Sequence, residues 1–115
     1  MTIDQSTAEG VLTLKVSGLI DLSASPKLRE DLHEIADTKP PAVVIDLSDV
    51  SYIDSSGLAT LIEFYRELNA DNGRLALCSL QPRVRTVFDL VRLNELFQIS
   101  DTAAAATAAV LAPKK

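Results

Sequence analysis

The chain has 115 residues, 47% of them hydrophobic, which is enough for one domain with its own core. Its net charge of −5 argues against unaided binding to nucleic acid or to an anionic membrane, because both require a basic surface. The single cysteine, Cys78, excludes an internal disulfide and a cysteine metal cluster, and is expected to be a buried small hydrophobe. Because no signal peptide or membrane-spanning run is evident, we expect a cytoplasmic protein.

The spacing of apolar residues predicts strands that alternate with helices. Apolar residues two apart indicate a half-buried strand, whereas spacings of three and four indicate one face of a helix. In chain order we expect a weak strand over residues 2–6, a turn at 9–10, a strand over 11–16 that the chain leaves over 18–21, a helix from 25–26 to about 37, a buried strand over 42–47, a helix over about 56–70, a strand over 74–78, a helix over 82–91, a short strand over 96–99 and an alanine-rich helix to about 111.

This order of elements indicates an α/β fold. A strand–helix–strand unit joins parallel strands, so the chain is expected to form a mixed sheet with parallel neighbours. We expect a single domain over residues 1–115, in which 101–115 form an alanine-rich helix and a frayed tail. In the helix over 56–70, the apolar face predicts that Leu61 and Ile62 are buried.

Polar residues and prolines indicate where the elements begin and end. Ser25 is expected to cap the first helix, with Pro26 at the first helical position. The buried strand over 42–47 is expected to end in a turn at 48–49. Residues 100–101 are expected to cap the last helix.

The stretch Asp54-Ser55-Ser56-Gly57 stands where the buried strand gives way to the longest predicted helix. Hydroxyl groups at a helix start can cap free backbone N–H groups. The same N–H groups, together with the positive end of the helix dipole, attract anions such as phosphate. Ser55 and Ser56 are therefore either caps or hydroxyls placed where a phosphate is tolerated, and the residues alone favour capping.

A longer motif changes this interpretation. Residues 45–58 read I-D-L-S-D-V-S-Y-I-D-S-S-G-L, and residues 18–21 read G-L-I-D. Both motifs resemble signatures of the STAS-domain anti-sigma factor antagonists, and the resemblance extends from about Val11 to Ile99. It implies the STAS fold, a four- to five-stranded mixed sheet with about four helices mainly on one face.

The resemblance also implies a phosphorylation switch. The serine before the glycine is the phosphate acceptor in this family, and here it is Ser56, with Ser55 as the second choice. An anti-sigma factor that is also a serine kinase supplies the ATP, and a serine phosphatase reverses the reaction. The unphosphorylated protein is expected to bind this kinase and to release its sigma factor, whereas phosphorylation ends the binding.

The partner-binding face implied by the resemblance consists of six residues. They are Asp21, Ser23, Asp54, Ser55, Ser56 and Gly57. Asp54 is expected either to align and activate the Ser56 hydroxyl or only to cap the helix. A glycine lacks a Cβ atom, so Gly57 is expected to let the partner approach the acceptor closely.

The chain departs from the family pattern at two positions. Leu19 stands where a charged residue is usual, which puts part of the partner contact in doubt. Arg92 stands where relatives often have glycine, which leaves the end of the third helix uncertain. Two other polar residues have modest expected roles: Asp46 either supports the acceptor loop or makes a hydrogen bond at its strand end, and His33 lies on the surface.

No residue pattern indicates an enzyme. The lone histidine is on a different predicted element from Ser56, and no phosphate-binding glycine loop or metal-ligand cluster occurs in the sequence. We therefore expect no catalytic residues, no cofactor and no metal. The alternative function is a STAS scaffold subunit without a phosphorylation cycle, in a stress-signalling assembly or an ABC-type lipid transport complex. A small-ligand carrier has no positive support.

Overall fold

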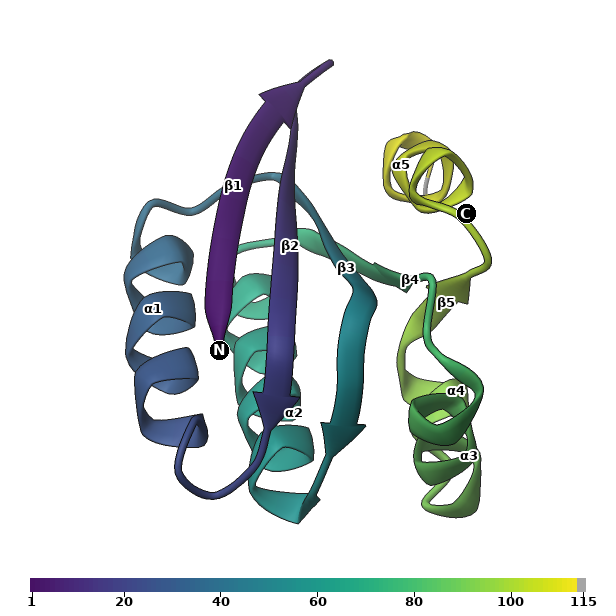
Figure 1. The fold of residues 1–115 in the computed structure, drawn as a ribbon. Coiled ribbons are helices and arrows are strands. Elements are labelled where there is room, and N and C mark those ends of the chain that lie inside the picture. The colour runs from purple at the N-terminus through teal and green to yellow at the C-terminus, as the bar shows by residue number, and fades with distance from the viewer. Residues whose placement is uncertain (114–115) are drawn as a thin grey trace.

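The computed structural model describes residues 1–113, which are built around a five-stranded sheet in the order β1-β2-β3-β4-β5 (Figure 1). The strands are β1 (Thr2–Ala8), β2 (Val11–Ile20), β3 (Ala42–Ile53), β4 (Arg74–Cys78) and β5 (Gln98–Ser100). The helices are α1 (Ser25–Asp37), α2 (Ser55–Ala70), α3 (Pro82–Leu90), α4 (Leu93–Leu96) and α5 (Ala103–Leu111). Strand β1 is antiparallel to β2, and the other neighbours are parallel, as the alternating elements predict.

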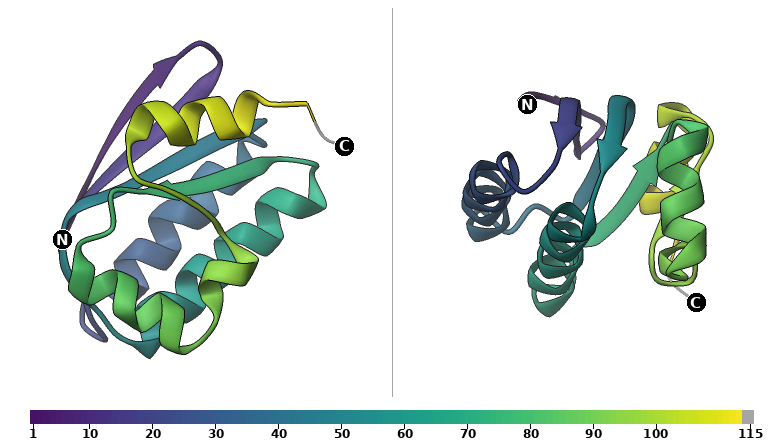
Figure 2. Two further views of the ribbon diagram at one scale, coloured as in Figure 1. Left: turned by 90° about the vertical axis from the view of Figure 1, so that its right-hand side faces the viewer. Right: turned by 60° about the horizontal axis from the view of Figure 1, so that its bottom comes forward.

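Helices cover the two faces of the sheet unequally. In the left view of Figure 2, α5 lies on the opposite side of the strands from α1, α2 and α3. The larger core, on the α1–α4 side, includes the fully buried Phe64 of α2 and Phe88 of α3. Leu61 is buried there as predicted, whereas Ile62 is only half-buried. The expectation of helices mainly on one face is confirmed.

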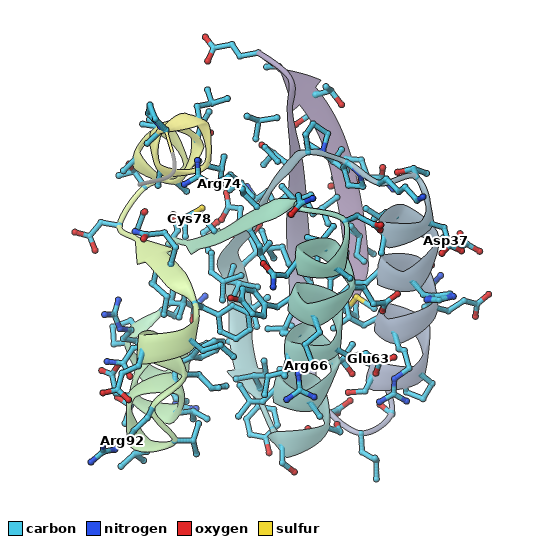
Figure 3. All side chains as sticks on the ribbon, turned by 180° about the vertical axis from the view of Figure 1, so that it is seen from behind. Asp37, Glu63, Arg66, Arg74, Cys78 and Arg92 are labelled. Carbon is cyan, nitrogen blue, oxygen red and sulfur yellow. The ribbon has the colours of Figure 1, made fainter. Side chains whose placement is uncertain are left out.

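A second, smaller core lies under α5. Ala106 and Val110 of α5 pack on the small residues of the sheet, including the buried Cys78. The Arg74 guanidinium donates hydrogen bonds to the backbone carbonyls of Ala109 and Ala112 at the end of this helix (Figure 3). The alanine-rich helix α5 is therefore held against the sheet in two ways, by packing of small side chains and by the hydrogen bonds from Arg74 to its last carbonyl groups.

Strands β2 and β3 are longer than the apolar runs indicate. The turn expected at 48–49 is wrong, because β3 continues to Ile53. Its second half pairs only with β2, since β4 ends at the level of Asp46, and polar side chains on this free edge face water. Strand β2 likewise continues to Ile20 through two register shifts, one of them next to Gly18, whose φ of +106° favours glycine.

Two expected helix caps are also wrong. Helix α1 begins at Ser25 itself, with Ala24 at the N-cap, and no side chain caps it. Helix α5 is capped by Thr102, whose hydroxyl oxygen accepts a hydrogen bond from the Ala105 N–H at 3.1 Å, rather than by residues 100–101. Ser25 is instead buried, and its hydroxyl contacts the hydroxyl of Ser56 at the start of α2.

The backbone conformation of Arg92 determines how α3 ends. It joins α3 to α4 in the left-handed conformation, with φ 60° and ψ 27°, and its side chain points into solvent (Figure 3). For a residue with a Cβ this conformation costs roughly 1–2 kcal/mol, whereas glycine adopts it freely.

We expect Arg92→Gly to raise the free energy of unfolding by about 0.5–1 kcal/mol, after the larger chain entropy of unfolded glycine is deducted. Chemical denaturation measures this change. The control is Arg66→Gly at an exposed position inside α2, which should lower the unfolding free energy by about 1 kcal/mol. Destabilisation by both variants would contradict the account of Arg92.

Candidate functional site

The carboxyl ends of β2 and β3 bring the two predicted motifs together. Ile20 pairs with Ile53 at the end of the parallel ladder, and the Asp54 N–H donates to the Ile20 carbonyl at 3.2 Å. Figure 1 shows both arrowheads at the lower edge of the sheet, where short loops lead into α1 and α2. Parallel neighbours end at the same edge, so the loop after β2, residues 21–24, adjoins the start of α2.

Asp54 caps α2. Its Oδ1 atom accepts hydrogen bonds from the Ser56 N–H at 3.0 Å and from the Gly57 N–H at 3.3 Å, and its backbone is extended as an N-cap requires. The same oxygen accepts the Ser56 hydroxyl at 2.6 Å. Two roles were expected for Asp54, capping of the helix and alignment of the Ser56 hydroxyl. The same oxygen, Oδ1, makes the contacts for both. The serines are not the caps.

Ser56 Oγ is also held from the opposite side. It lies 2.7 Å from Ser25 Oγ, across 31 positions of sequence, and Ser25 Oγ lies 2.9 Å from the Asp21 carbonyl oxygen. A continuous chain of polar contacts therefore runs from Asp54 through both serines to Asp21. It joins the starts of α1 and α2 at the Ser56 hydroxyl.

Asp21 organises the loop after β2. Its Oδ1 atom accepts hydrogen bonds from the Ser23 hydroxyl at 2.7 Å and from the backbone N–H groups of Ser23 and Ala24 at 3.1 Å each. Such an aspartate turn fixes the loop locally. Ser23 is exposed, and the intervening Leu22 is 74% exposed, so this loop presents polar and apolar groups beside the half-exposed Ser56.

Both site carboxylates are stabilised in their ionised form. The hydrogen bond from the Ser56 hydroxyl lowers the pKa of Asp54, with smaller contributions from backbone N–H groups. The Ser23 hydroxyl and the Ala24 N–H lower the pKa of Asp21 in the same way. The site therefore carries two negative charges at neutral pH, one on Asp54 and one on Asp21.

Gly57 serves the interior of the domain. It is buried, and a Cβ atom at this position would lie 2.5 Å from Ile20 Cγ2 and 2.8 Å from Ile53 Cγ1. The expectation that Gly57 leaves room for a partner is therefore wrong. The missing Cβ lets α2 begin directly against the ends of β2 and β3.

Ser55 differs from Ser56 in its surroundings. It is exposed, and no hydrogen bond of its side chain is found within residues 1–113. It borders a shallow apolar groove of about 280 Å³ between α2 and the α3–α4 junction, which the sequence did not indicate. The groove is lined by Ser55, Leu58, Ala59, Ile62, Val91 and Leu93.

The other polar residues singled out from the sequence lie away from this site. The Asp46 carboxylate accepts the Ser48 N–H at 2.9 Å within β3, and it does not contact the acceptor loop. His33 is exposed as expected, and its Nδ1 lies 2.8 Å from a Glu67 oxygen across the α1–α2 contact, which raises the pKa of the imidazole. Leu19, the unusual residue before Ile20, is half-exposed.

No group of three or more histidine, cysteine, aspartate or glutamate side chains within residues 1–113 is placed to hold a metal ion. Over the same residues, no helix is both long and apolar enough to cross a bilayer.

Ser25 is the residue that the sequence analysis placed in the wrong role. A signal was present: Ser25, Leu28 and Leu32 follow the spacing i, i+3, i+7, so the serine lies on the apolar, inward face of α1. A hydroxyl in such a position must find a buried partner, and here the partner is Ser56.

Gly57→Ala tests the internal role of the glycine. Helix propensity alone predicts stabilisation, but the added methyl group would overlap the side chains of Ile20 and Ile53. We expect the free energy of unfolding to fall by about 1–3 kcal/mol, measured by chemical denaturation. An unchanged or increased stability would show that space at Gly57 is not limiting.

The lowered pKa of Asp54 predicts a pH dependence of stability. Its ionised form stabilises the fold above the unfolded-state pKa of about 3.9, and this contribution is lost as the pH falls through the lower folded-state pKa. Asp54→Asn keeps a capping oxygen but removes the charge. We expect the wild type to melt above this variant at neutral pH, with a gap that narrows between about pH 5 and pH 3. A gap that is constant with pH would contradict this.

Comparison with known proteins identifies the family. The STAS domain family model matches residues 2–106. The anti-sigma-B factor antagonist of Bacillus subtilis (strain 168) is 31% identical over 100 residues, covering 87% of this chain and 91% of the relative. The crystal structure of an anti-sigma factor antagonist from Mycobacterium paratuberculosis matches with a TM-score of 0.87 at 32% identity, covering 95% of this chain and 92% of that one.

One further structural neighbour has been solved in two states. SpoIIAA, a cell fate determinant of Bacillus, is 22% identical in its unphosphorylated form, with a TM-score of 0.80 and coverage of 99% of this chain and 100% of that one. Its phosphorylated form matches with a TM-score of 0.71, covering 95% and 99%. The fold, the position of the Asp-Ser-Ser-Gly motif and these matches lead to one conclusion: the chain belongs to the STAS domain family.

Proposed function

We propose that this protein is an anti-sigma factor antagonist controlled by phosphorylation of Ser56. The unphosphorylated form binds an anti-sigma factor serine kinase and frees its sigma factor, and phosphorylation of Ser56 ends the complex. A serine phosphatase restores the binding form. The names of the relatives support antagonism, and one observation carries the switch: a half-exposed serine hydroxyl lies 2.6 Å from an ionised carboxylate at a helix start.

The geometry favours Ser56 over Ser55 as the acceptor. A serine hydroxyl becomes a better nucleophile when a neighbouring base takes its proton, and Asp54 Oδ1 is within hydrogen-bond reach of Ser56 Oγ. The side chain of Ser55 lacks such a carboxylate partner among the hydrogen bonds of the described residues. The partner kinase supplies ATP and the groups that stabilise the transferring phosphoryl group.

Phosphorylation changes the charge of the surface without a need to change the fold. The Ser56 and Gly57 N–H groups at the start of α2 already bond to Asp54, so a phosphate finds these donors occupied. It adds about −1.5 to −2 charges beside the carboxylates of Asp54 and Asp21. A partner surface matched to a neutral hydroxyl then meets a concentrated negative charge, with both repulsion and a desolvation cost.

The partner-binding surface is proposed to combine the loop after β2 with the start of α2. Asp21 and Ser23 offer acceptors, the exposed Leu22 offers an apolar contact, and Ser55 and Ser56 lie beside them. Gly57 acts indirectly, by setting the position of α2. In this proposal the chain binds and is modified, and it performs no catalysis of its own.

Mass spectrometry after incubation with the partner kinase and ATP tests the acceptor. We expect one phosphate on Ser56, no incorporation in Ser56→Ala, and normal incorporation in the control Ser55→Ala. Ser56→Ala should still bind the kinase, because it introduces no charge, and Ser55→Ala is compared for phosphate incorporation alone. Phosphate on Ser55 alone would refute the assignment, and no phosphate on any variant would favour the scaffold alternative.

Asp21→Ala tests the loop contribution to binding. We expect weaker kinase binding by calorimetry without unfolding of the domain, because the loop loses the carboxylate that organises it. Asp21→Asn keeps one oxygen acceptor and should lose less affinity, which separates loop order from charge. Asp71→Ala, exposed at the far end of α2, is the control and should bind as the wild type does. Unchanged affinity of Asp21→Ala would remove this loop from the interface.

A further inference from the structure

Ser25 has an unusual environment for a serine at a helix start. Its side chain is 3% exposed, and Ser56 Oγ lies 2.7 Å away. Two hydroxyl hydrogens are available for three contacts, those of Ser56 with Asp54, Ser25 with Ser56, and Ser25 with the Asp21 carbonyl. The position of the two hydrogens therefore decides what Ser25 does.

The surrounding acceptors compete for these two hydrogens. The ionised Asp54 carboxylate can only accept, so it takes the Ser56 hydrogen. The Asp21 carbonyl accepts the Ser25 N–H at 2.9 Å and shares the Ala24 N–H with its own carboxylate, so it has backbone donors besides the Ser25 hydroxyl that lies 2.9 Å away. The Ser25 hydrogen is therefore available to Ser56 Oγ. In this arrangement Ser56 Oγ donates to Asp54, accepts from Ser25 and keeps one free lone pair.

We propose that Ser25 is a positioning residue for phosphorylation of Ser56: its buried hydroxyl donates to Ser56 Oγ before the reaction and to the phosphoserine after it. This inference rests on the proposed function and adds a residue from outside the Asp-Ser-Ser-Gly motif. Two fixed contacts restrict the Ser56 side chain to one rotamer and direct its free lone pair outward.

In the proposed reaction the Ser56 hydroxyl is the nucleophile. The free lone pair of Ser56 Oγ forms a bond to the γ-phosphorus of ATP held by the kinase. The bond from that phosphorus to the oxygen bridging to ADP breaks, and its electron pair leaves with ADP. The Ser56 hydrogen passes to Asp54 Oδ1 and then to solvent.

The hydrogen bond from Ser25 matters more to phosphoserine at position 56 than to the unmodified serine. Phosphoserine has no hydroxyl hydrogen at Oγ, so the 2.6 Å contact with Asp54 becomes one between two acceptors and must lengthen. Ser25 remains as a buried neutral donor on the opposite side. Its hydrogen bond favours the doubly charged phosphate, because a donor stabilises the form that accepts more strongly.

Phosphorus NMR of the chain with phosphoserine incorporated at position 56 during translation tests this without a kinase. Titration gives the second pKa of the phosphate. We expect Ser25→Ala to raise that pKa by about half a unit or more, because the dianion loses a donor. If the alanine variant folds poorly, Ser25→Cys takes its place, because it keeps a side chain of similar size with only a weak donor. We expect Ser25→Cys to raise the second pKa of the phosphate as well.

The control is Thr60→Val. Thr60 is also buried, but its hydroxyl donates to the backbone carbonyl of Ser56 and not to the acceptor oxygen. We expect this variant to leave the phosphate pKa unchanged, although it too loses a buried hydrogen bond. An unchanged phosphate pKa in folded Ser25→Ala and Ser25→Cys, or an equal rise in Thr60→Val, would overturn the proposal.

The kinase reaction provides an independent readout. We expect Ser25→Ala to lower the rate of phosphate transfer about tenfold while the affinity for the kinase stays within twofold, because a buried side chain cannot touch the partner. An unchanged transfer rate would overturn the positioning role. If no variant, wild type included, accepts phosphate, the proposed function fails, and the phosphate pKa still decides whether Ser25 donates to position 56.

Discussion

One carboxylate oxygen determines the geometry of the whole site. Asp54 Oδ1 accepts two backbone N–H groups at the start of α2 and the hydroxyl of Ser56. The contact that caps the start of α2 therefore also places a carboxylate against the hydroxyl of Ser56, the proposed phosphate acceptor. Because these N–H donors are occupied, we expect a phosphate on Ser56 to remain a surface charge rather than to be bound by the N–H groups at the start of α2.

The parallel pairing of β2 and β3 supplies the second constraint. The two strands end in register at Ile20 and Ile53, and the buried Gly57 packs directly on both residues. This close approach brings Ser25 of α1 to within 2.7 Å of Ser56 of α2. The polar chain through Asp21, Ser25, Ser56 and Asp54 thus depends on a tight apolar contact beneath it. Helix α5 lies on the opposite face of the sheet and takes no part (Figure 2).

Much of the fold follows from the sequence, and the exceptions have physical causes. Apolar spacing predicts the order of strands and helices, but it misses the second half of β3. The buried residues there, Leu47, Val50 and Ile53, are three apart because the pairing with β2 shifts register, so they do not show the two-residue alternation of a regular strand. Arg92 departs from the family pattern, and its left-handed backbone gives the reason, since glycine is the residue that such a junction favours.

The candidate site was predictable only in part. The motif identified Asp54 and Ser56, because both lie within one short segment at a strand–helix junction. It could not reveal the contact with Ser25, which joins positions 31 residues apart, nor the internal packing role of Gly57. Both depend on how closely two helices approach the sheet, and a single sequence does not specify that distance.

We propose that Ser56 is the residue at which a neutral hydroxyl permits partner binding and a phosphate prevents it. Calorimetry with the anti-sigma factor kinase tests this most directly, with one chain unmodified and the other carrying phosphoserine at position 56. We predict that the two chains melt alike and that the phosphorylated one binds at least thirtyfold more weakly, a difference of about 2 kcal/mol. Equal affinities of two folded proteins would contradict the account.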